Sequence, residues 1–341
     1  MNPTMLQNQI YLDEIAGGYR AAQVLFTACR LGVFEVIGHD ALELATVVER
    51  LGSDRRGTRV LLDALVGMGL LEMRDGRYLN SALALDALLP TAPHSRIAQL
   101  LHGARLYERW AGLYDAVLTG QPVPDDRIDP RIDSGKAAFA RAMADSARQI
   151  AATTAASLDL DGVSKLLDIG GGPGLYSIEF ARRSSGLRAW ILDDAETLRV
   201  AERNIETAGL GDRVTLLPGD AHSDDLGGPY DFIFISNVLH IYSGDRNREL
   251  VRRCAAALGK GGRLALKDFF LQDTAGGGKS GPLWNLLFAA NMLAGTAEGD
   301  CYTEGEVRTW SRDAGLDLSQ KIPLTERTSI LVFRNQPRTS R

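Results

Sequence analysis

The sequence lacks three features that would each indicate a specialised class of protein. It has only three cysteines, Cys29, Cys254 and Cys301, which lie far apart and form no CxxC or cysteine–histidine spacing. No apolar run approaches the roughly 20 residues that a membrane-spanning helix needs. Basic residues are not in excess either, since the formal net charge is −5. These absences argue against a disulfide scaffold, a metal site, a membrane partner and a nucleic-acid partner.

Length and composition favour an ordinary globular protein of two domains. The chain has 341 residues, more than one compact core usually takes, with 45% apolar and 24% charged residues. The first residues, MNPTMLQNQIYLDEI, show no basic stretch followed by an apolar one. We therefore expect no signal peptide, a cytoplasmic location and free thiols.

Residues 1–95 have the pattern of a winged-helix domain. The stretch YRAAQVLFTACRLGVFEVI repeats apolar residues at three- and four-residue intervals, and residues 42–80 read as helix, turn, helix and a short hairpin around RDG. We predict an N-terminal all-helical winged-helix domain with this hairpin as its wing. The basic residues Arg55, Arg56 and Arg59 stand only at the start of its second helix, which is otherwise largely apolar. Because a helix that reads DNA carries several long polar side chains, the pattern favours dimerisation over the alternative of a ligand-sensing DNA-binding regulator.

The remainder of the chain has the pattern of an α/β protein. Residues 96–160 contain two helical patterns on either side of a Pro/Asp-rich loop, which we interpret as a bridge that contributes to a substrate pocket. From residue 161, short β-type runs alternate with helical patterns and predict a mostly parallel sheet with helices on both faces. Two last runs within residues 316–335 predict a terminal hairpin. The β-type runs are residues 165–170, 188–194, 213–220, 231–239 and 262–271.

A glycine-rich loop follows the first of these strands. LLDIGGGPGLYS places Gly170, Gly171, Gly172 and Gly174 between a strand and a helix. Glycines there let a ligand approach the backbone at the positive end of a helix. Leu175 occupies the third glycine position of the dinucleotide pattern G-x-G-x-x-G, so an NAD-dependent oxidoreductase is disfavoured.

Aspartates lie at the ends of three consecutive strands beside this loop. They are Asp168 in the first strand, Asp193 at the end of the second strand, about 20 residues after the glycine loop, and Asp220 after the third strand. A carboxylate in the position of Asp193 can accept hydrogen bonds from ribose hydroxyl groups. The loop and the acids together predict a site for a nucleotide-like ligand.

With these motifs the chain resembles the S-adenosylmethionine-dependent methyltransferases of the Rossmann-like class. It is most similar to the small-molecule O-methyltransferases with an N-terminal dimerisation domain, which include plant caffeic acid-type enzymes and bacterial enzymes of secondary metabolism. The resemblance covers nearly the whole chain and includes LLDIGGGPG, LPGDA, SNVLH, LGKGGRLALKDF and NMLAGTAEGDCYTEGEVRTWSRDAGL. It implies a class I methyltransferase sheet with an antiparallel last strand in residues 161–341, and a homodimer formed through residues 1–95. The implied reaction is methyl transfer to a hydroxyl group of an aromatic or conjugated small molecule. Carbon methylation, or loss of methyl transfer, remain alternatives within the family.

The resemblance also implies which residues bind S-adenosyl-L-methionine. Gly170 and Gly172 would pack against its methionine and ribose parts, and Asp193 would bind the ribose hydroxyl groups. Asp220 and Ala221 would flank the adenine. The full set that it implies is Asp168, Gly170, Gly172, Gly174, Asp193, Asp220, Ala221 and Ser236.

His240 follows the fourth strand, and Asp268 follows the apolar run of the fifth. Because these strands are neighbours in a sheet of this class, the two side chains are expected to meet at the edge where the cofactor methyl group lies. A carboxylate orients an imidazole and favours its charged form, which suits removal of a proton from a phenol or enol. A buried, satisfied histidine is the alternative from the residues alone. The family motif NVLH ends in the catalytic base, which implies that His240 is the base and Asp268 its partner.

Three departures from the family pattern surround this histidine. The family's HDWSD reads HIYSG here, so Ile241 replaces an aspartate and Tyr242 a tryptophan, while Cys301 stands where relatives carry a second carboxylate. They leave two roles open for His240, taking the proton or only positioning the substrate.

Candidate substrate contacts come from the bridge helices and from GPLWNLLFAANML. Ordinary core packing is the alternative for the apolar candidates, whereas Asn291 is a polar amide within an apolar helix. The candidates are Tyr107, Trp110, Phe139, Met143, Trp284, Phe288, Asn291 and Met292.

Overall fold

The computed structural model describes residues 3–127 and 135–335, which form two compact units. Unit 1 contains the described residues up to 105, and unit 2 contains 106–127 and 135–335. Within these residues, no helix has the length and apolarity needed to cross a membrane.

Unit 1 is the predicted winged helix. Asp75 and Gly76 both have positive φ and form the two-residue turn of its wing, as the RDG signal predicts. The predicted stripe of residues 19–37 is two helices, because Gly32 adopts a left-handed conformation (φ 71°) and ends the first of them. The wing is a three-stranded sheet of order β1-β3-β2, so the unit is helical in the main but not entirely. Its elements are α1 (Pro3–Gly17), α2 (Tyr19–Leu31), α3 (Val33–Ile37), β1 (Leu42–Glu43), α4 (Leu44–Leu51), α5 (Arg55–Gly67), β2 (Leu71–Arg74), β3 (Arg77–Asn80) and α6 (Ala82–Ala87).

Most of the predicted bridge belongs to unit 2. Its first helix, α7 (Ile97–Trp110), contributes residues to both units. The assignment of separate roles to residues 1–95, 96–160 and 161–341 stays a prediction. The other helical elements of unit 2 are α8 (Leu113–Thr119), η1 (Asp125–Arg127), α9 (Lys136–Arg148), α10 (Ala151–Ser157), α11 (Leu175–Arg183), α12 (Ala195–Ala208), η2 (Leu239–Ile241), α13 (Gly244–Ala257), α14 (Leu283–Gly295) and α15 (Glu304–Asp313).

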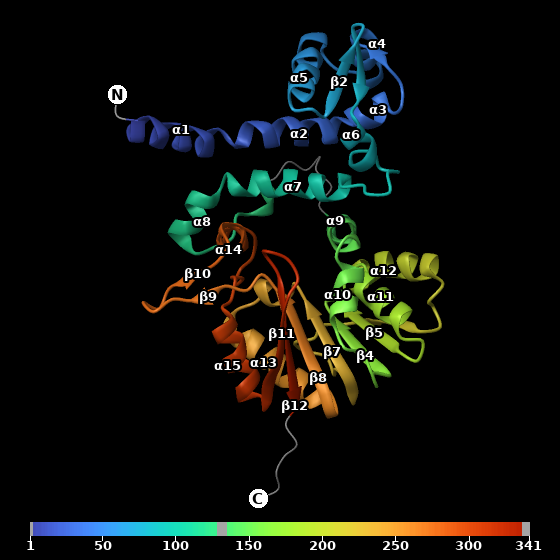
Figure 1. Cartoon of the computed structure of the whole chain (residues 1–341), viewed down its shortest axis with the longest axis vertical. Coiled ribbons are helices and arrows are strands. Elements are labelled where there is room, and N and C mark those ends of the chain that lie inside the picture. Colours follow the sequence, from blue (N-terminus) through green and yellow to red (C-terminus); the bar gives the residue numbers. More distant parts are fainter. Residues whose placement is uncertain (1–2, 128–134, 336–341) are drawn as a thin grey trace, which may run out of the picture. The chain divides into compact units, whose positions relative to one another are not determined.

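A seven-stranded sheet of order β11-β12-β8-β7-β4-β5-β6 forms the centre of unit 2 (Figure 1). Strands β4 to β8 are parallel, while β12 runs antiparallel to both β8 and β11. The prediction of a mostly parallel sheet with a reversed last strand is confirmed. The strands of unit 2 are β4 (Lys165–Ile169), β5 (Arg188–Asp193), β6 (Val214–Pro218), β7 (Tyr230–Ser236), β8 (Leu258–Asp268), β9 (Gln272–Asp273), β10 (Lys279–Ser280), β11 (Leu316–Pro323) and β12 (Ser329–Asn335).

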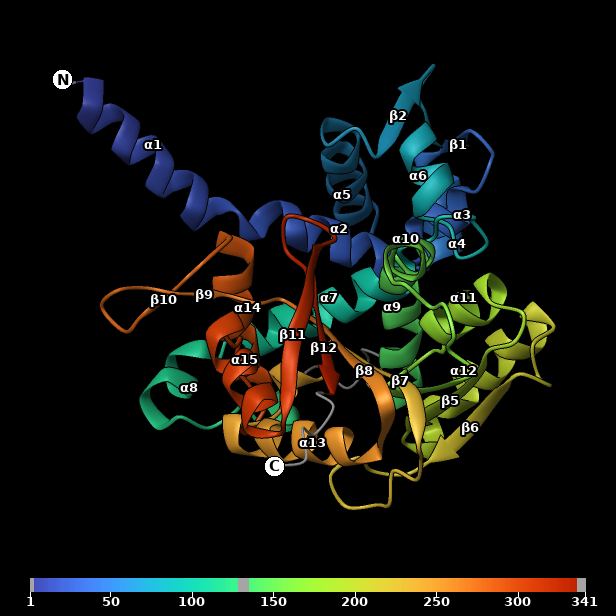
Figure 2. The same ribbon diagram turned by 60° about the horizontal axis from the view of Figure 1, so that its bottom comes forward.

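Hydrophobic cores cover both faces of this sheet. Along β7, Phe232 and Phe234 pack against the core under α10, α11 and α12, whereas Ile233 and Ile235 pack against the core under α13 and α15. Figure 2 shows these two helix groups on opposite sides of the strands. Burial on both faces explains why the run FIFI is apolar without alternation. The strand ends at Ser236, three residues earlier than predicted, because the chain turns there into the short helix η2.

Candidate active site

The loop between β4 and α11 has room only for glycine at several positions. A Cβ on Gly170 would lie 2.4 Å from Cγ2 of Val238, and one on Gly174 would lie 3.0 Å from Cδ1 of Ile191. At Gly172 such a Cβ would meet only the carbonyl oxygen of Gly170, at an ordinary contact distance of 3.9 Å, so this position is the least crowded of the three. All three glycines have positive φ, between 55° and 77°. The loop can therefore receive a ligand directly against its backbone.

The predicted carboxylates lie at the ends of neighbouring strands. Asp193 accepts hydrogen bonds from the backbone N–H groups of Gly172 (2.9 Å) and Asp194 (2.7 Å). Burial nonetheless raises the pKa of Asp193 above its ordinary value. Asp220 is exposed after β6, and its Oδ1 accepts from the backbone of His222 (2.9 Å).

The other implied cofactor residues lie near the same edge. Ala221 is buried after Asp220, at 9% exposure. Ser236 is half-buried at the end of β7, where its Oγ donates to Oδ1 of Asn237 (3.3 Å). Their location does not test contact with the cofactor, so the roles of both residues in cofactor binding stay predictions.

Asp168 lies beneath the loop and is fully buried. Its Oδ2 accepts a hydrogen bond from Oγ of Ser177 (2.7 Å), whereas Oδ1 has no partner within the described part of the chain. Burial raises the pKa of Asp168 to about 7. An unsatisfied acidic group, uncrowded glycine backbone and two further carboxylates fit a ligand with ribose hydroxyl groups and positive charge, as S-adenosylmethionine has.

The structure brings His240 and Asp268 together, as the adjacency of their strands predicts. Nδ1 of His240 lies 2.7 Å from Oδ1 of Asp268, which also accepts from the backbone N–H of Phe269 (2.8 Å). Exposure is 8% for His240 and 3% for Asp268. Burial acts to raise the pKa of Asp268, but His240, the backbone N–H of Phe269 and the charge of Lys267 together hold the pKa below its usual value. With Nδ1 committed to the carboxylate, Nε2 is the nitrogen left for a reacting group.

Aromatic rings enclose this histidine. The ring of Phe288 stands edge-on to His240, with centroids 4.9 Å apart, and Trp284 stacks on Phe288 at 5.0 Å. Phe269 lies 4.7 Å from both of these rings. Sequence reasoning named Trp284 and Phe288 but missed Phe269, whose signal was its place directly after Asp268. The cluster makes an aromatic wall beside His240.

Asn291 continues the same face of α14, seven residues after Trp284. Its Oδ1 accepts a hydrogen bond from Nε1 of Trp110 (2.8 Å). Because an indole N–H only donates, this bond fixes the orientation of the amide and leaves its NH₂ group as a donor. Asn291 is 7% exposed, so this polar amide is buried within unit 2.

The remaining substrate candidates have no such clear position. Met292 is buried at 8% exposure, Phe139 is 47% exposed, and Tyr107 and Met143 are half-buried on α7 and α9. Their part in a pocket stays a prediction. A cavity of about 250 Å³ lies at the other end of the strands, lined by Leu158, Asp159, Leu160, Asp161, Arg183 and Ser184.

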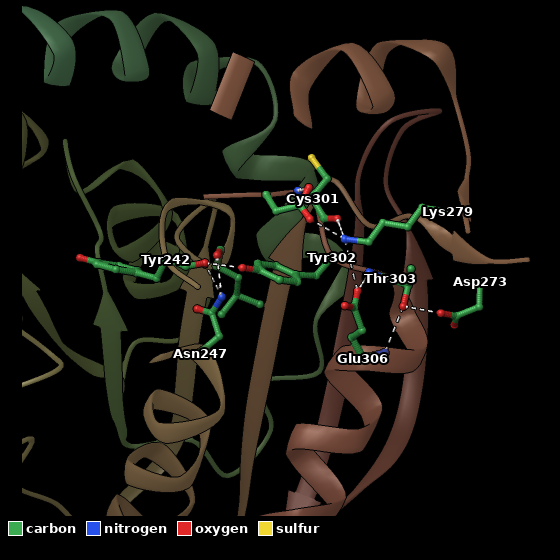
Figure 3. A network of polar contacts seen from close by, with 10 residues as sticks. Tyr242, Asn247, Asp273, Lys279, Cys301, Tyr302, Thr303 and Glu306 are labelled. Carbon is green, nitrogen blue, oxygen red and sulfur yellow. Dashed lines mark hydrogen bonds and ion pairs between the residues drawn. The ribbon is translucent and has the colours of Figure 1, made fainter. Parts of the chain in front are cut away.

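A polar network holds the turn after His240 (Figure 3). The hydroxyl of Tyr302 donates to the carbonyl oxygen of Tyr242 (2.5 Å), and Nδ2 of Asn247 donates to the same oxygen (3.1 Å). Asn247 is fully buried and also donates to the carbonyl of Leu239 (2.7 Å). The side-chain amide of Asn247 is thus hydrogen-bonded to the chain both before and after His240.

Cys301 belongs to the neighbouring part of this network. Its carbonyl oxygen accepts from Nζ of Lys279 (2.8 Å), which also pairs with Asp300 (2.6 Å), while its sulfur points away from Lys279 (Figure 3). Burial, with Asp268 nearby, raises the pKa of the Cys301 thiol to about 12. A neutral thiol therefore occupies the position of the family's second acid. Among the described contacts, Asp268 is the acid that touches His240.

The chain is similar to known proteins in both of its parts. A model of the O-methyltransferase domain matches residues 128–317, and a model of the O-methyltransferase dimerisation domain matches residues 13–89. The 3-hydroxy-5-methyl-1-naphthoate 3-O-methyltransferase of Streptomyces sahachiroi is 33% identical over 89% of this chain and 88% of its own length. The tetracenomycin polyketide synthesis 8-O-methyl transferase of Streptomyces glaucescens is 31% identical over 89% of each chain. The crystal structure of human N-acetylserotonin methyltransferase with SAM superposes with a TM-score of 0.84 at 25% identity, covering 97% of this chain and 98% of that one.

Proposed function

The chain belongs to the family of S-adenosylmethionine-dependent O-methyltransferases with an N-terminal dimerisation domain, and from this premise we propose that His240 is the general base of the reaction. The single observation that carries the proposal is the buried contact of 2.7 Å between Nδ1 of His240 and Asp268. When bound, S-adenosylmethionine supplies an electrophilic methyl group on its sulfonium. Nε2 of His240 accepts the hydroxyl proton of the acceptor, and Asp268 stabilises the resulting imidazolium.

The residues around the glycine loop support the proposed cofactor contacts. Gly172 offers uncrowded backbone, and Asp193 and Asp220 offer carboxylate oxygens at the ends of β5 and β6. Gly170 lies against Val238, two residues before His240, so the loop packs against the segment that leads to the base. This packing would place the cofactor beside the base, where positioning supplies much of the acceleration.

The acceptor proposed for this site is an aromatic small molecule. Phe269, Trp284 and Phe288 offer ring faces and edges next to the base, and a flat ring gains from such contacts beyond the area that it buries. Asn291 would donate a hydrogen bond to an oxygen of the acceptor. Two relatives support this class, since they are named for a naphthoate and for tetracenomycin.

The domain arrangement is part of the proposal. Residues 1–95 would form a homodimer, consistent with the matched dimerisation domain, and residues 96–160 would contribute to the pocket of a cytoplasmic enzyme. Nucleic acid is not among the proposed partners, because the basic residues of α5 stand only at its start and the formal net charge of the chain is −5.

Incubation of the protein with S-adenosylmethionine and a panel of hydroxynaphthoates and phenols tests the function. We expect a product heavier by one methylene unit, identified as a methyl ether by NMR, and its loss in His240→Ala. Formation of a carbon–methyl bond instead would favour the family's C-methylating members. Full turnover by His240→Ala with a weakly acidic phenol would remove the base assignment.

A further inference from the structure

Lys267 is a buried cation next to the pair formed by His240 and Asp268. It lies on β8 directly before Asp268 and is 3% exposed. Side chains alternate along a strand, so Lys267 projects from the face of the sheet opposite to Asp268. Lysine is almost never fully buried unless its charge is paired, because transfer of an ammonium out of water is costly.

No carboxylate pairs with this ammonium within the residues that the structure describes. Nζ of Lys267 donates one hydrogen bond, to Oδ1 of Asn237 (2.8 Å), and lies 5.4 Å from the ring centre of Tyr176. An ammonium has three donors, so a neutral amide and a ring leave it incompletely satisfied. Lys279 provides the contrast, because it is less buried and still pairs with Asp300 at 2.6 Å.

The groups around Lys267 are sequence neighbours of residues in the proposed cofactor site. Asn237 directly follows Ser236, has a left-handed backbone (φ 59°), and donates its own N–H to the carbonyl of Lys267 (2.8 Å). Tyr176 is the second residue of α11, directly after the glycine loop. The ammonium therefore lies at the carboxyl edge of the sheet, between the loop and the end of β7.

We propose that the Lys267 ammonium binds a carboxylate carried by one of the two reactants. This inference rests on the proposed function, which brings two possible sources to this edge. One is the α-carboxylate of S-adenosylmethionine, and the other is a carboxylate on an aromatic acceptor. In either case the bound anion supplies the close ion pair that the described residues do not, since Asp268 attracts this ammonium only from a longer distance.

Calorimetry on the full-length protein tests this assignment. S-adenosylhomocysteine and its decarboxylated analogue are titrated into the wild type and Lys267→Met. If the cofactor is the source, the variant weakens S-adenosylhomocysteine by about 10- to 100-fold, the size of a charge-assisted hydrogen bond, and spares the analogue. Lys279→Met is the matched control, since it removes a lysine that already has a carboxylate partner, and it should leave the preference for the carboxylate unchanged.

The second arm compares a hydroxynaphthoate with the naphthol that lacks its carboxylate, both titrated into the complex with S-adenosylhomocysteine. If the acceptor is the source, Lys267→Met weakens only the hydroxynaphthoate. Equal effects on carboxylate and carboxylate-free ligands in both arms would overturn the proposal and leave Lys267 as a structural clamp on Asn237. If the Met variant does not fold, Lys267→Gln, whose amide can still donate to Asn237, answers the same question. Failure of the wild type to bind S-adenosylhomocysteine would instead refute the proposed function.

Discussion

Replacement of Asp268 by asparagine tests the buried pair with little change of shape. Oδ1 of Asp268 accepts from both His240 and Phe269, and Oδ2 has no partner among the described atoms. An asparagine can keep its oxygen in the Oδ1 position and place its NH₂ where Oδ2 was. The substitution then removes the charge and leaves both hydrogen bonds.

The expected loss follows from that charge. A hydrogen bond to an ionised group contributes about 1–2 kcal/mol more than a neutral one, and this difference is felt when the imidazolium forms. We therefore expect kcat to fall by about 5- to 30-fold, with S-adenosylhomocysteine affinity unchanged. The assay is steady-state methyl transfer at saturating cofactor and acceptor, followed by mass spectrometry.

A double-mutant cycle separates this role from a structural one. If Asp268 acts through His240, Asp268→Asn has little further effect in a His240→Ala background. Turnover of Asp268→Asn within about twofold of the wild type, or additive losses in the double variant, would refute the reasoning.

Three further predictions concern the surroundings of the site. Gly299→Ala places a Cβ 2.4 Å from the carbonyl oxygen of His240 and should lower turnover, and also stability by about 1–3 kcal/mol in urea unfolding. Gly186→Ala is the control, because its Cβ would lie in open space. Equal stability of the two variants would contradict this prediction. Burial raises the pKa of Asp168 from 3.8 to about 7, so the folded state retains a proton that the unfolded chain releases, and stability falls as pH rises through this window. Relative to the wild type, Asp168→Asn should gain up to about 1.4 kcal/mol per pH unit between these values in urea unfolding, and parallel pH profiles would argue against it. Cys29, Cys254 and Cys301 are buried, and burial raises the pKa of each thiol to about 12. None of them should therefore react rapidly with a disulfide reagent until the chain is denatured. Rapid reaction of any thiol in the folded protein would show that this packing is wrong.

The sheet could be predicted because its signals are local. Short apolar runs between helical patterns identified β4 to β8, and the terminal pair identified the reversed strand. Element ends were less predictable, since they depend on tertiary contacts. β7 ends at Ser236 within an apolar run, where the asparagine that follows adopts a left-handed conformation held by Lys267.

The site was predictable only where strand order determines it. Adjacent strands were enough to bring His240 to Asp268, but the position of Phe269 depends on how the chain turns after β8. The burial of Lys267 was also missed, although a lysine within the apolar run LALK was a visible signal. Asn291 could be suspected from its polarity, but its partner Trp110 lies 181 residues away in the sequence.

The central claim, that His240 removes the acceptor proton, is tested most directly with two phenols of similar shape, of which only one is ionised at the assay pH. The measurement is the ratio of kcat/KM between wild type and His240→Ala for each phenol. A general base contributes about 100- to 10,000-fold, so the account predicts a loss of that order for the neutral phenol and little loss for the ionised one. An equal loss for both would contradict it and leave His240 as a residue that only positions the acceptor.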